Sequence, residues 1–221
     1  MMLRLRDHPK PSSVAARSFE GKVAGYAAAL FVVLPFLVLY IDGPASSFIL
    51  SVQSDWGLRV ANAITAMGYG LADAAIAGIL LVIGLKAGKP REALAGRLGL
   101  FAVIVSSLSG QILKNLFCRS RPLTEKSGEF FSEFPCLGKG AGFISFPSGH
   151  TVTAFALAFV LARAYPRYAV LFYGLAVLVA LSRVYLAKHF PSDVVAGAAV
   201  GIMAGWIVCR FAAFSLVHGR T

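Results

Sequence analysis

The feature of this 221-residue chain that most constrains its fold is a series of long apolar runs separated by short polar connections. Hydrophobic residues make up 57% of the chain and charged residues only 14%, too few to cover a soluble domain of this length. Backbone polar groups must be paired inside a bilayer, so each run is predicted to form a helix of about 20 residues. We therefore predict an all-α, integral membrane six-transmembrane-helix bundle, one domain over residues 1–221, with spans at 22–41, within 62–86, and at 94–117, 148–164, 168–187 and 193–214.

Two segments lie outside these runs. Residues 43–61 are too polar to span, and Trp56 suits the headgroup region, so we predict an interfacial helix between the first two spans. Residues 1–21 form a basic tail that contains proline and serine. A cleaved signal peptide is the alternative interpretation of the N-terminal region, but the apolar run that follows is long for such a peptide. The sequence favours a retained first helix, and "GYG" at 68–70 is a candidate break in the second.

The formal net charge of +11 comes from basic residues distributed among the short connections. This distribution is typical of membrane topology and argues against nucleic-acid binding. Lys and Arg are more frequent on the side that carries both termini and the connections between spans 2 and 3 and spans 4 and 5. We therefore predict cytoplasmic termini in a bacterial inner membrane, with the connections at 118–147 and between the last two spans facing the periplasm. The oligomeric state is left open.

Three polar clusters stand out against the apolar pattern, and this topology places all of them on the outward side. In the first, Lys114 and Arg121 are seven positions apart and would share a helix face, with Pro122 ending the helix. A basic collar at the end of a membrane helix would have the same composition, because long cationic side chains reach toward the headgroups.

The second cluster, Phe-Pro-Ser-Gly-His-Thr, directly precedes the predicted fourth span. Ser148 can cap the helix N-terminus, where free N–H groups at Ser148 and Gly149 would bind an anion. His150 would then lie in the first turn beside that anion. An ordinary capped helix with an interfacial histidine is the alternative.

The third cluster joins the fifth and sixth spans. Arg183 lies inside an apolar run, where a guanidinium normally needs a partner or a task. Asp193 can hold one nitrogen of His189 and leave the other free to attack an electrophile. For Asp193 alone, a simple helix cap is the alternative.

Together these clusters read Lys-x6-Arg-Pro, Pro-Ser-Gly-His and Ser-Arg-x5-His-x3-Asp. This three-part pattern resembles the type 2 phosphatidic acid phosphatase (PAP2) superfamily, and the six apolar runs are similar to its membrane lipid-phosphate phosphatases. The resemblance implies that His189 is the nucleophile that forms a phosphohistidine, that Asp193 orients it, and that His150 is first general acid and then general base. It also implies a set of phosphate-binding residues: Lys114, Arg121, Arg183, Ser148 and Gly149.

The resemblance implies hydrolysis of a phosphomonoester or pyrophosphate on a membrane lipid, at the outer face and without metal or cofactor. A phosphotransferase of the same fold and a transporter of anionic lipids are the alternatives. Undecaprenyl diphosphate, phosphatidylglycerol phosphate, phosphatidate and the 1-phosphate of lipid A all present a phosphate at the headgroup plane, and the sequence does not choose among them.

The predicted outward loop, 118–147, is rich in phenylalanine and would lie over the site at the bilayer surface. It can guide a lipid headgroup or act only as an interfacial anchor. Cys118 and Cys136 both fall on the outward side, where disulfides form. Closing this loop would stabilise the fold by about 3 kcal/mol. Whether the pair is oxidised is left open.

Overall fold

The computed structural model describes Gly25, residues 28–138 and residues 140–218, with side chains through residue 212. The predicted basic tail at 1–21 and the first residues of the predicted first span lie outside the described residues. The elements are a first helix over Ala28–Val52, which includes a π-helical segment η1 (Leu37–Ile41) and α2 (Asp42–Val52), then α3 (Asp55–Ala66), α4 (Gly70–Lys86), α5 (Pro90–Phe117), η2 (Ala141–Phe143), α6 (Gly149–Ala164), η3 (Pro166–Tyr168), α7 (Ala169–Tyr185) and α8 (Pro191–His218).

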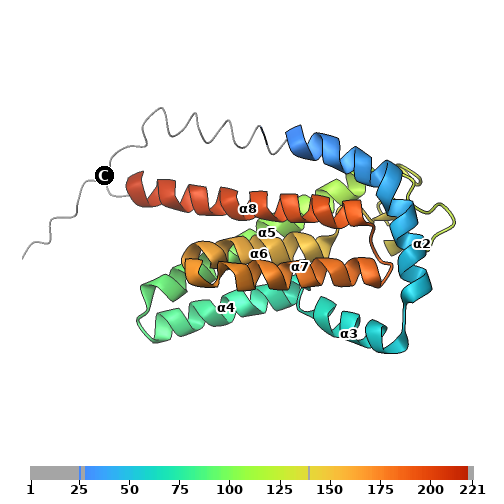
Figure 1. The fold of residues 1–221 in the computed structure, drawn as a ribbon. Coiled ribbons are helices and arrows are strands. Elements are labelled where there is room, and N and C mark those ends of the chain that lie inside the picture. Colours follow the sequence, from blue (N-terminus) through green and yellow to red (C-terminus); the bar gives the residue numbers. More distant parts are fainter. Residues whose placement is uncertain (1–24, 26–27, 139, 219–221) are drawn as a thin grey trace, which may run out of the picture.

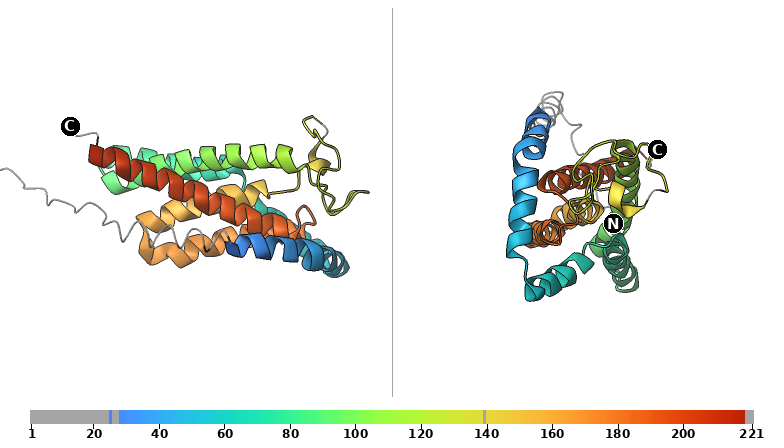
Figure 2. Two further views of the ribbon diagram at one scale, coloured as in Figure 1. Left: turned by 90° about the horizontal axis from the view of Figure 1, so that it is seen from above. Right: turned by 90° about the vertical axis from the view of Figure 1, so that its right-hand side faces the viewer.

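Helices α4 to α8 lie alongside one another, and α6 is enclosed by the others (Figures 1 and 2). Most of the residues of α6 between Thr151 and Leu161 are buried, and their apolar side chains form the core with α5, α7 and α8. Since protein rather than lipid surrounds α6, its 16 residues need not match the full thickness of the hydrocarbon layer.

The predicted spans correspond to helices with ends shifted by a few residues, and α5 to α8 cover the last four of them. Among the described helices, four are long and apolar enough to cross a membrane, and a fifth results if α3 and α4 are one span bent by 47°. The predicted count of six is not confirmed, because α6 is shorter than a full span. The predicted break at 68–70 is present, since α3 ends at Ala66 and α4 begins at Gly70.

The prediction of a single interfacial helix over 43–61 is not confirmed either. Residues 42–52 continue the first helix beyond the π-helical segment, and α2 runs across the end of the bundle (Figure 1). The extended backbone at Gln53 ends this helix. Ser54 then accepts a hydrogen bond from the Gly57 N–H and begins α3, as expected of an N-cap serine.

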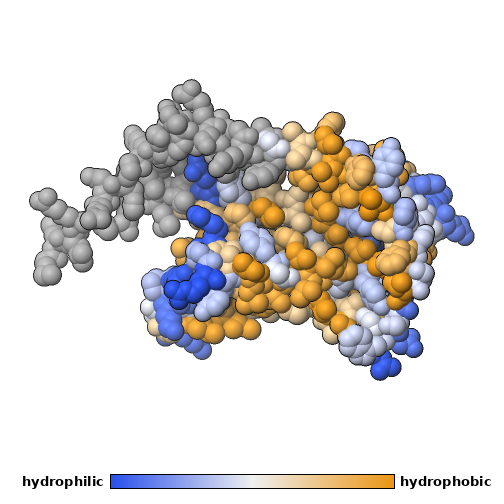
Figure 3. Space-filling view, viewed as in Figure 1, coloured by the Kyte–Doolittle hydropathy of each residue, from blue (hydrophilic) through white to orange (hydrophobic). Residues whose placement is uncertain are grey.

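Apolar side chains cover the middle of the surface and hydrophilic ones gather toward its ends (Figure 3). Large side chains on several helices are mostly exposed, including Phe31, Leu71, Leu108, Ile112 and Val170. A continuous apolar surface of this kind would be unstable in water and fits the hydrocarbon layer. The chain is an integral membrane protein.

The topology brings four helix ends to one end of the bundle: the C-termini of α5 and α7 and the N-termini of α6 and α8 (Figure 1). Close packing of α6 on α8 sets their relative position. A Cβ atom added at Gly201 would lie 2.3 Å from the Val152 carbonyl oxygen. The Ser148 N–H donates to the Asp193 carbonyl oxygen at 3.0 Å, which joins the starts of the two helices.

Candidate active site

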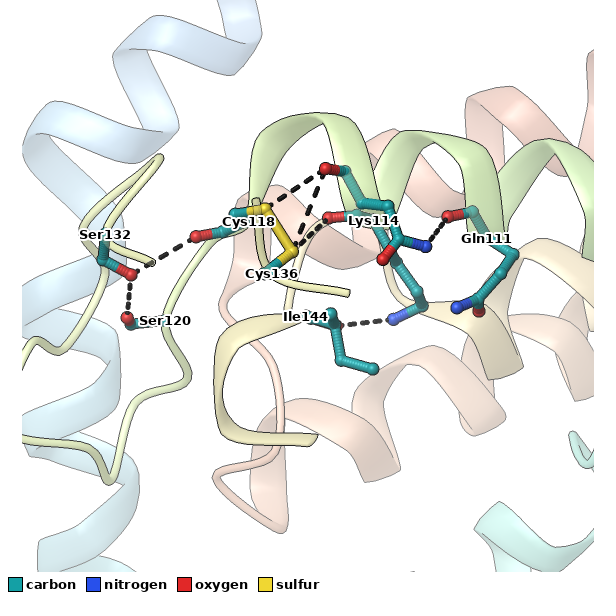
Figure 4. The surroundings of a disulfide bond; sticks show 8 residues. Gln111, Lys114, Cys118, Ser120, Ser132, Cys136 and Ile144 are labelled. Atoms are coloured by element: carbon teal, nitrogen blue, oxygen red, sulfur yellow. Dashed lines mark hydrogen bonds between the residues drawn. A yellow bond between two sulfur atoms is a disulfide. The ribbon is translucent and has the colours of Figure 1, made fainter. Parts of the chain in front are cut away.

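Lys114 lies in the last turn of α5, where its side chain is only 8% exposed and its Nζ donates to the Ile144 carbonyl oxygen at 2.7 Å. Cys118, in the left-handed region with φ of 41°, ends this helix. Cys118 and Cys136 are joined in a disulfide beside Lys114, and Ser132 donates to the Cys118 carbonyl oxygen (Figure 4). The loop at 118–147 is therefore held next to the lysine.

His150 lies in the first turn of α6, and its ring packs against the ring of Tyr69 with centroids 4.5 Å apart. Its Nε2 is buried and has no hydrogen-bond partner. Ser148 is the N-cap residue, but the predicted side-chain cap is wrong, because its hydroxyl instead accepts a hydrogen bond from Thr151 Oγ1. The first N–H groups of α6 are thus left for another acceptor.

Arg121 and Arg183 reach the same region from the loop and from α7. Arg183 Nη1 donates to Thr65 Oγ1 at 2.9 Å, whereas the Nε atoms of both arginines are buried without a partner. Burial lowers the pKa of Arg121 from its ordinary value. Unpaired donors on two buried guanidinium groups are costly without an acceptor, and a phosphate oxygen is the acceptor they suit best.

His189 follows α7 and Asp193 lies in the first turn of α8, with 3.5 Å between His189 Nδ1 and Asp193 Oδ2. The carboxylate favours the tautomer with a proton on Nδ1, which leaves the Nε2 lone pair for a substrate. Burial of the imidazole lowers the pKa of His189 to about 4, against the opposing effect of Asp193. The ring is therefore neutral and nucleophilic at physiological pH.

The sequence-predicted residues meet in this one region. His150 lies close enough to Arg183, His189, Lys114 and Arg121 for electrostatic interaction. A buried cationic region with two imidazoles, one held by a carboxylate, can bind a phosphate, attack its phosphorus and protonate a leaving oxygen. The prediction that Lys114 and Arg121 share a helix face is wrong, because α5 ends at Phe117 and Arg121 lies in the loop that follows.

Sequence reasoning missed Arg119, which is 1% exposed and donates to Asp193 Oδ1 at 2.6 Å and to Asp42 Oδ2 at 2.7 Å. It also missed Ser145, whose hydroxyl donates to Asp193 Oδ2 at 2.5 Å. Asp42 carried a usable signal, because it interrupts the apolar run of the first helix. Ser145 carried none that distinguishes it from other loop serines.

A cavity of about 190 Å³ adjoins His150. It lies between the start of α4, the last turns of α5 and the start of α6. Its lining includes several glycines and the polar residues Ser106, Ser107, Gln111, Lys114, His150 and Thr153.

Residues 96–215 match the PAP2 superfamily. A lipid A 1-phosphatase of Rhizobium johnstonii is 41% identical over 101 residues, which are 46% of this chain and 41% of the relative, so the chain spans less than half the length of that protein. A transmembrane PAP2-type phosphatidylglycerolphosphate phosphatase from Bacillus subtilis has a TM-score of 0.60 and 25% identity, covering 84% of this chain and 95% of that one. LpxE of Aquifex aeolicus has the same fold, with a TM-score of 0.57, 24% identity and coverage of 75% and 92%. Because the family match extends over more than half of the sequence, the chain belongs to the PAP2 superfamily.

Proposed function

We propose that the protein hydrolyses a phosphomonoester or pyrophosphate on a membrane lipid through a phosphohistidine intermediate. The observation that carries this proposal is the set of buried, unpaired nitrogens on Arg121, His150 and Arg183, all at the same end of the bundle as the His189–Asp193 pair. Such donors are paired in most native structures, and a phosphate would satisfy them together.

In the first step His189 Nε2 attacks phosphorus while Asp193 holds Nδ1 and stabilises the positive charge that develops on the ring. Burial and the neighbouring cations lower the pKa of His150, and the negative charge of a bound phosphate raises it again, so the ring is protonated when substrate is bound. The bond from phosphorus to the lipid oxygen breaks, and protonated His150 gives that oxygen its proton. In the second step His150 removes a proton from water, and the water oxygen attacks phosphorus. The P–N bond then breaks, which releases inorganic phosphate and neutral His189.

Lys114, Arg121 and Arg183 would balance the charge on the phosphoryl oxygens, with help from the Gly149 N–H in the first turn of α6. The Ser148 N–H, which was also expected to help, is instead donated to the Asp193 carbonyl oxygen. Phosphoryl transfer requires mainly positioning and charge stabilisation, so we propose turnover without a divalent metal. The disulfide at Cys118 and Cys136 supports an outward-facing site, since such bonds persist in oxidising compartments such as the periplasm.

Phosphate release from a panel of lipid phosphates by purified protein tests this function. The panel follows the relatives, which are named for lipid A 1-phosphate and phosphatidylglycerol phosphate, and adds phosphatidate and a prenyl diphosphate. We expect release in excess EDTA with no acceptor alcohol present, inhibition by vanadate, and a loss of about 10²–10⁴ in rate for His189→Gln. Release that needs an added acceptor would indicate a phosphotransferase, and full loss in EDTA restored by Mg²⁺ would contradict metal-independent turnover.

A further inference from the structure

The cavity beside His150 touches only one part of the proposed catalytic site. His150 and Lys114 line it, whereas His189, Arg121 and Arg183 do not. In an in-line displacement the leaving oxygen lies opposite the attacking nitrogen, on the side of the general acid. A cavity that adjoins the acid but not the nucleophile is therefore where the leaving group of the substrate would lie.

The wall of this cavity is chemically suited to hydroxyl groups. Ser107 and Gln111 on α5 present a hydroxyl and an amide, and Thr153 on α6 presents a second hydroxyl, which donates to the Gly68 carbonyl oxygen at 3.2 Å. The side chains of Gln111 and Lys114 extend to the same side of α5, away from the disulfide (Figure 4). A hydrocarbon leaving group would remove water from the Ser107 hydroxyl and the Gln111 amide without replacing their hydrogen bonds, which costs free energy.

The volume also fits a compact polar group. Four glycines, at 68, 70, 110 and 149, line the cavity and keep it open. A Cβ added at Gly70 would lie 3.6 Å from Thr153 Cγ2 and 3.7 Å from Ser107 Oγ, which are ordinary contact distances. A methyl group at position 70 would therefore contact two lining residues without a clash, and a larger side chain would take up part of the cavity.

We propose, on the basis of the proposed function, that this cavity is the leaving-group subsite and that it selects a lipid whose phosphate is attached to a hydroxyl-bearing headgroup, a sugar or a glycerol. A lipid phosphate with a bare prenyl alcohol as leaving group cannot use the polar wall. The subsite thus narrows the substrate class beyond the phosphate itself.

The test compares kcat/KM for a glycosyl 1-phosphate lipid with kcat/KM for a prenyl monophosphate in the same mixed micelles. Gln111→Leu removes a polar group from the cavity, and Asn115→Leu is the control one turn further along α5, outside the lining. We expect the sugar-to-prenyl ratio to fall about 10-fold in Gln111→Leu, the loss of one good hydrogen bond. Asn115→Leu should keep the wild-type ratio.

A second pair of variants tests the volume. Gly70→Val should lower the same ratio, whereas Gly78→Val, on α4 where an added Cβ meets nothing within 4 Å, should not. Unchanged ratios in both Gln111→Leu and Gly70→Val, with the wild type active on both lipids, would overturn the subsite. Release of phosphate from neither lipid by the wild type would contradict the proposed function itself, and the subsite with it.

A separate observation concerns the first helix. Asp42 is 2% exposed, and its carboxylate accepts hydrogen bonds from Arg119 Nη2 and from the Ser192 N–H at 2.7 and 3.0 Å. The Arg119 guanidinium lies over the rings of Phe130 and Phe190, at 4.6 and 4.2 Å from their centroids. It is thereby fixed in one orientation, with one nitrogen on Asp42 and another on Asp193.

This arrangement constrains the carboxylate that faces His189. Arg119 holds Asp193 Oδ1, while Ser145 and the Phe190 N–H hold Oδ2 on the side of the imidazole. Without Asp42, the full charge of Arg119 would act on Asp193 and weaken its interaction with His189. We infer that Asp42 and Arg119 are positioning residues, through which the first helix sets the orientation of the nucleophile.

Asp42→Asn tests this role, with Asp55→Asn at the start of α3 as the control, because Asp55 is exposed and lies outside the network. We expect Asp42→Asn to lower kcat by about 10- to 100-fold, as small misplacements of reacting groups do. KM should stay near the wild-type value, since the phosphate-binding cations are untouched. A wild-type kcat in folded Asp42→Asn, or a raised KM with kcat unchanged, would overturn the inference.

Discussion

Asp193 is a buried carboxylate that its hydrogen-bond partners keep charged. It is fully buried, yet each of its oxygens accepts at least one hydrogen bond, and Arg119 supplies an opposite charge at 2.6 Å. Burial of an ion without such partners would be prohibitive. The neutral imidazole beside it is the group that we propose as the nucleophile.

The lowered pKa of His189 predicts how stability depends on pH. The folded-state pKa is about 4 and the unfolded value is about 6.5, so the unfolded state binds more protons between these values. The free energy of unfolding should therefore fall as pH drops, with His189 contributing a loss of about 1.5 kcal/mol between pH 6.5 and pH 5. Melting of the detergent-solubilised protein should decline less steeply in His189→Asn; equal declines would contradict the shift.

The candidate site was largely predictable because its residues have unusual positions in the sequence. Arg183, His150 and Asp193 each lie at or within an apolar run, where charge is rare. Arg119 was missed because a basic collar at the end of a membrane helix explains the cationic residues of this segment without giving any one of them a separate role. The cavity was missed because glycines and serines in a membrane helix are equally typical of helix packing.

The site depends on the packing of α6 against α8, because these two helices carry His150 and Asp193. Gly201→Ala would place a methyl group against the Val152 carbonyl oxygen and the Ala156 nitrogen, both backbone atoms of α6. We expect lower thermal stability and a large loss of activity, since overpacking commonly costs about 1–3 kcal/mol. Gly174→Ala on α7, where an added Cβ meets nothing within 4 Å, should behave as wild type; equal effects of the two changes would contradict this packing role.

The disulfide between Cys118 and Cys136 restrains the loop at 118–147. Its loop of 18 residues predicts a loss of about 3 kcal/mol in the chain-entropy estimate when Cys118→Ser and Cys136→Ser are combined. A lower melting temperature of the double variant in detergent, and an equal drop in wild type with reductant, would match this expectation. Full stability under both conditions would contradict it.

Helix ends were less predictable than helices. The periodicity and length of the apolar runs indicate where helices lie. The first helix nevertheless continues as α2 beyond its predicted end at residue 41, because the buried partners Arg119 and Ser192 satisfy the Asp42 carboxylate. Such a contact joins residues far apart in the sequence. The local sequence pattern therefore predicted that the first span ends just before Asp42.

In the bundle as a whole, the short central helix α6 is the feature that the length of its apolar run does not explain. An enclosed helix can be short because its surface packs against neighbouring helices rather than lipid. With 16 residues, α6 is not among the described helices that are long enough to span by themselves. The α4–α5 and α6–α7 connections lie at the end of the bundle opposite the site (Figure 1), and they carry or adjoin Lys86, Lys89, Arg91 and Arg163. Basic residues at this end are what the predicted cytoplasmic position of these connections requires.

We propose that the three polar clusters, which are far apart in the sequence, form one pocket in which His189 attacks phosphorus. Acid-free quenching during turnover of a lipid substrate labelled with radioactive phosphate, followed by peptide mapping, tests it directly. We expect a label that is stable in base, labile in acid and carried by His189, and that is absent from folded His189→Gln. Steady turnover with no labelled protein on the time scale of catalysis, or a label on another residue, would contradict the account.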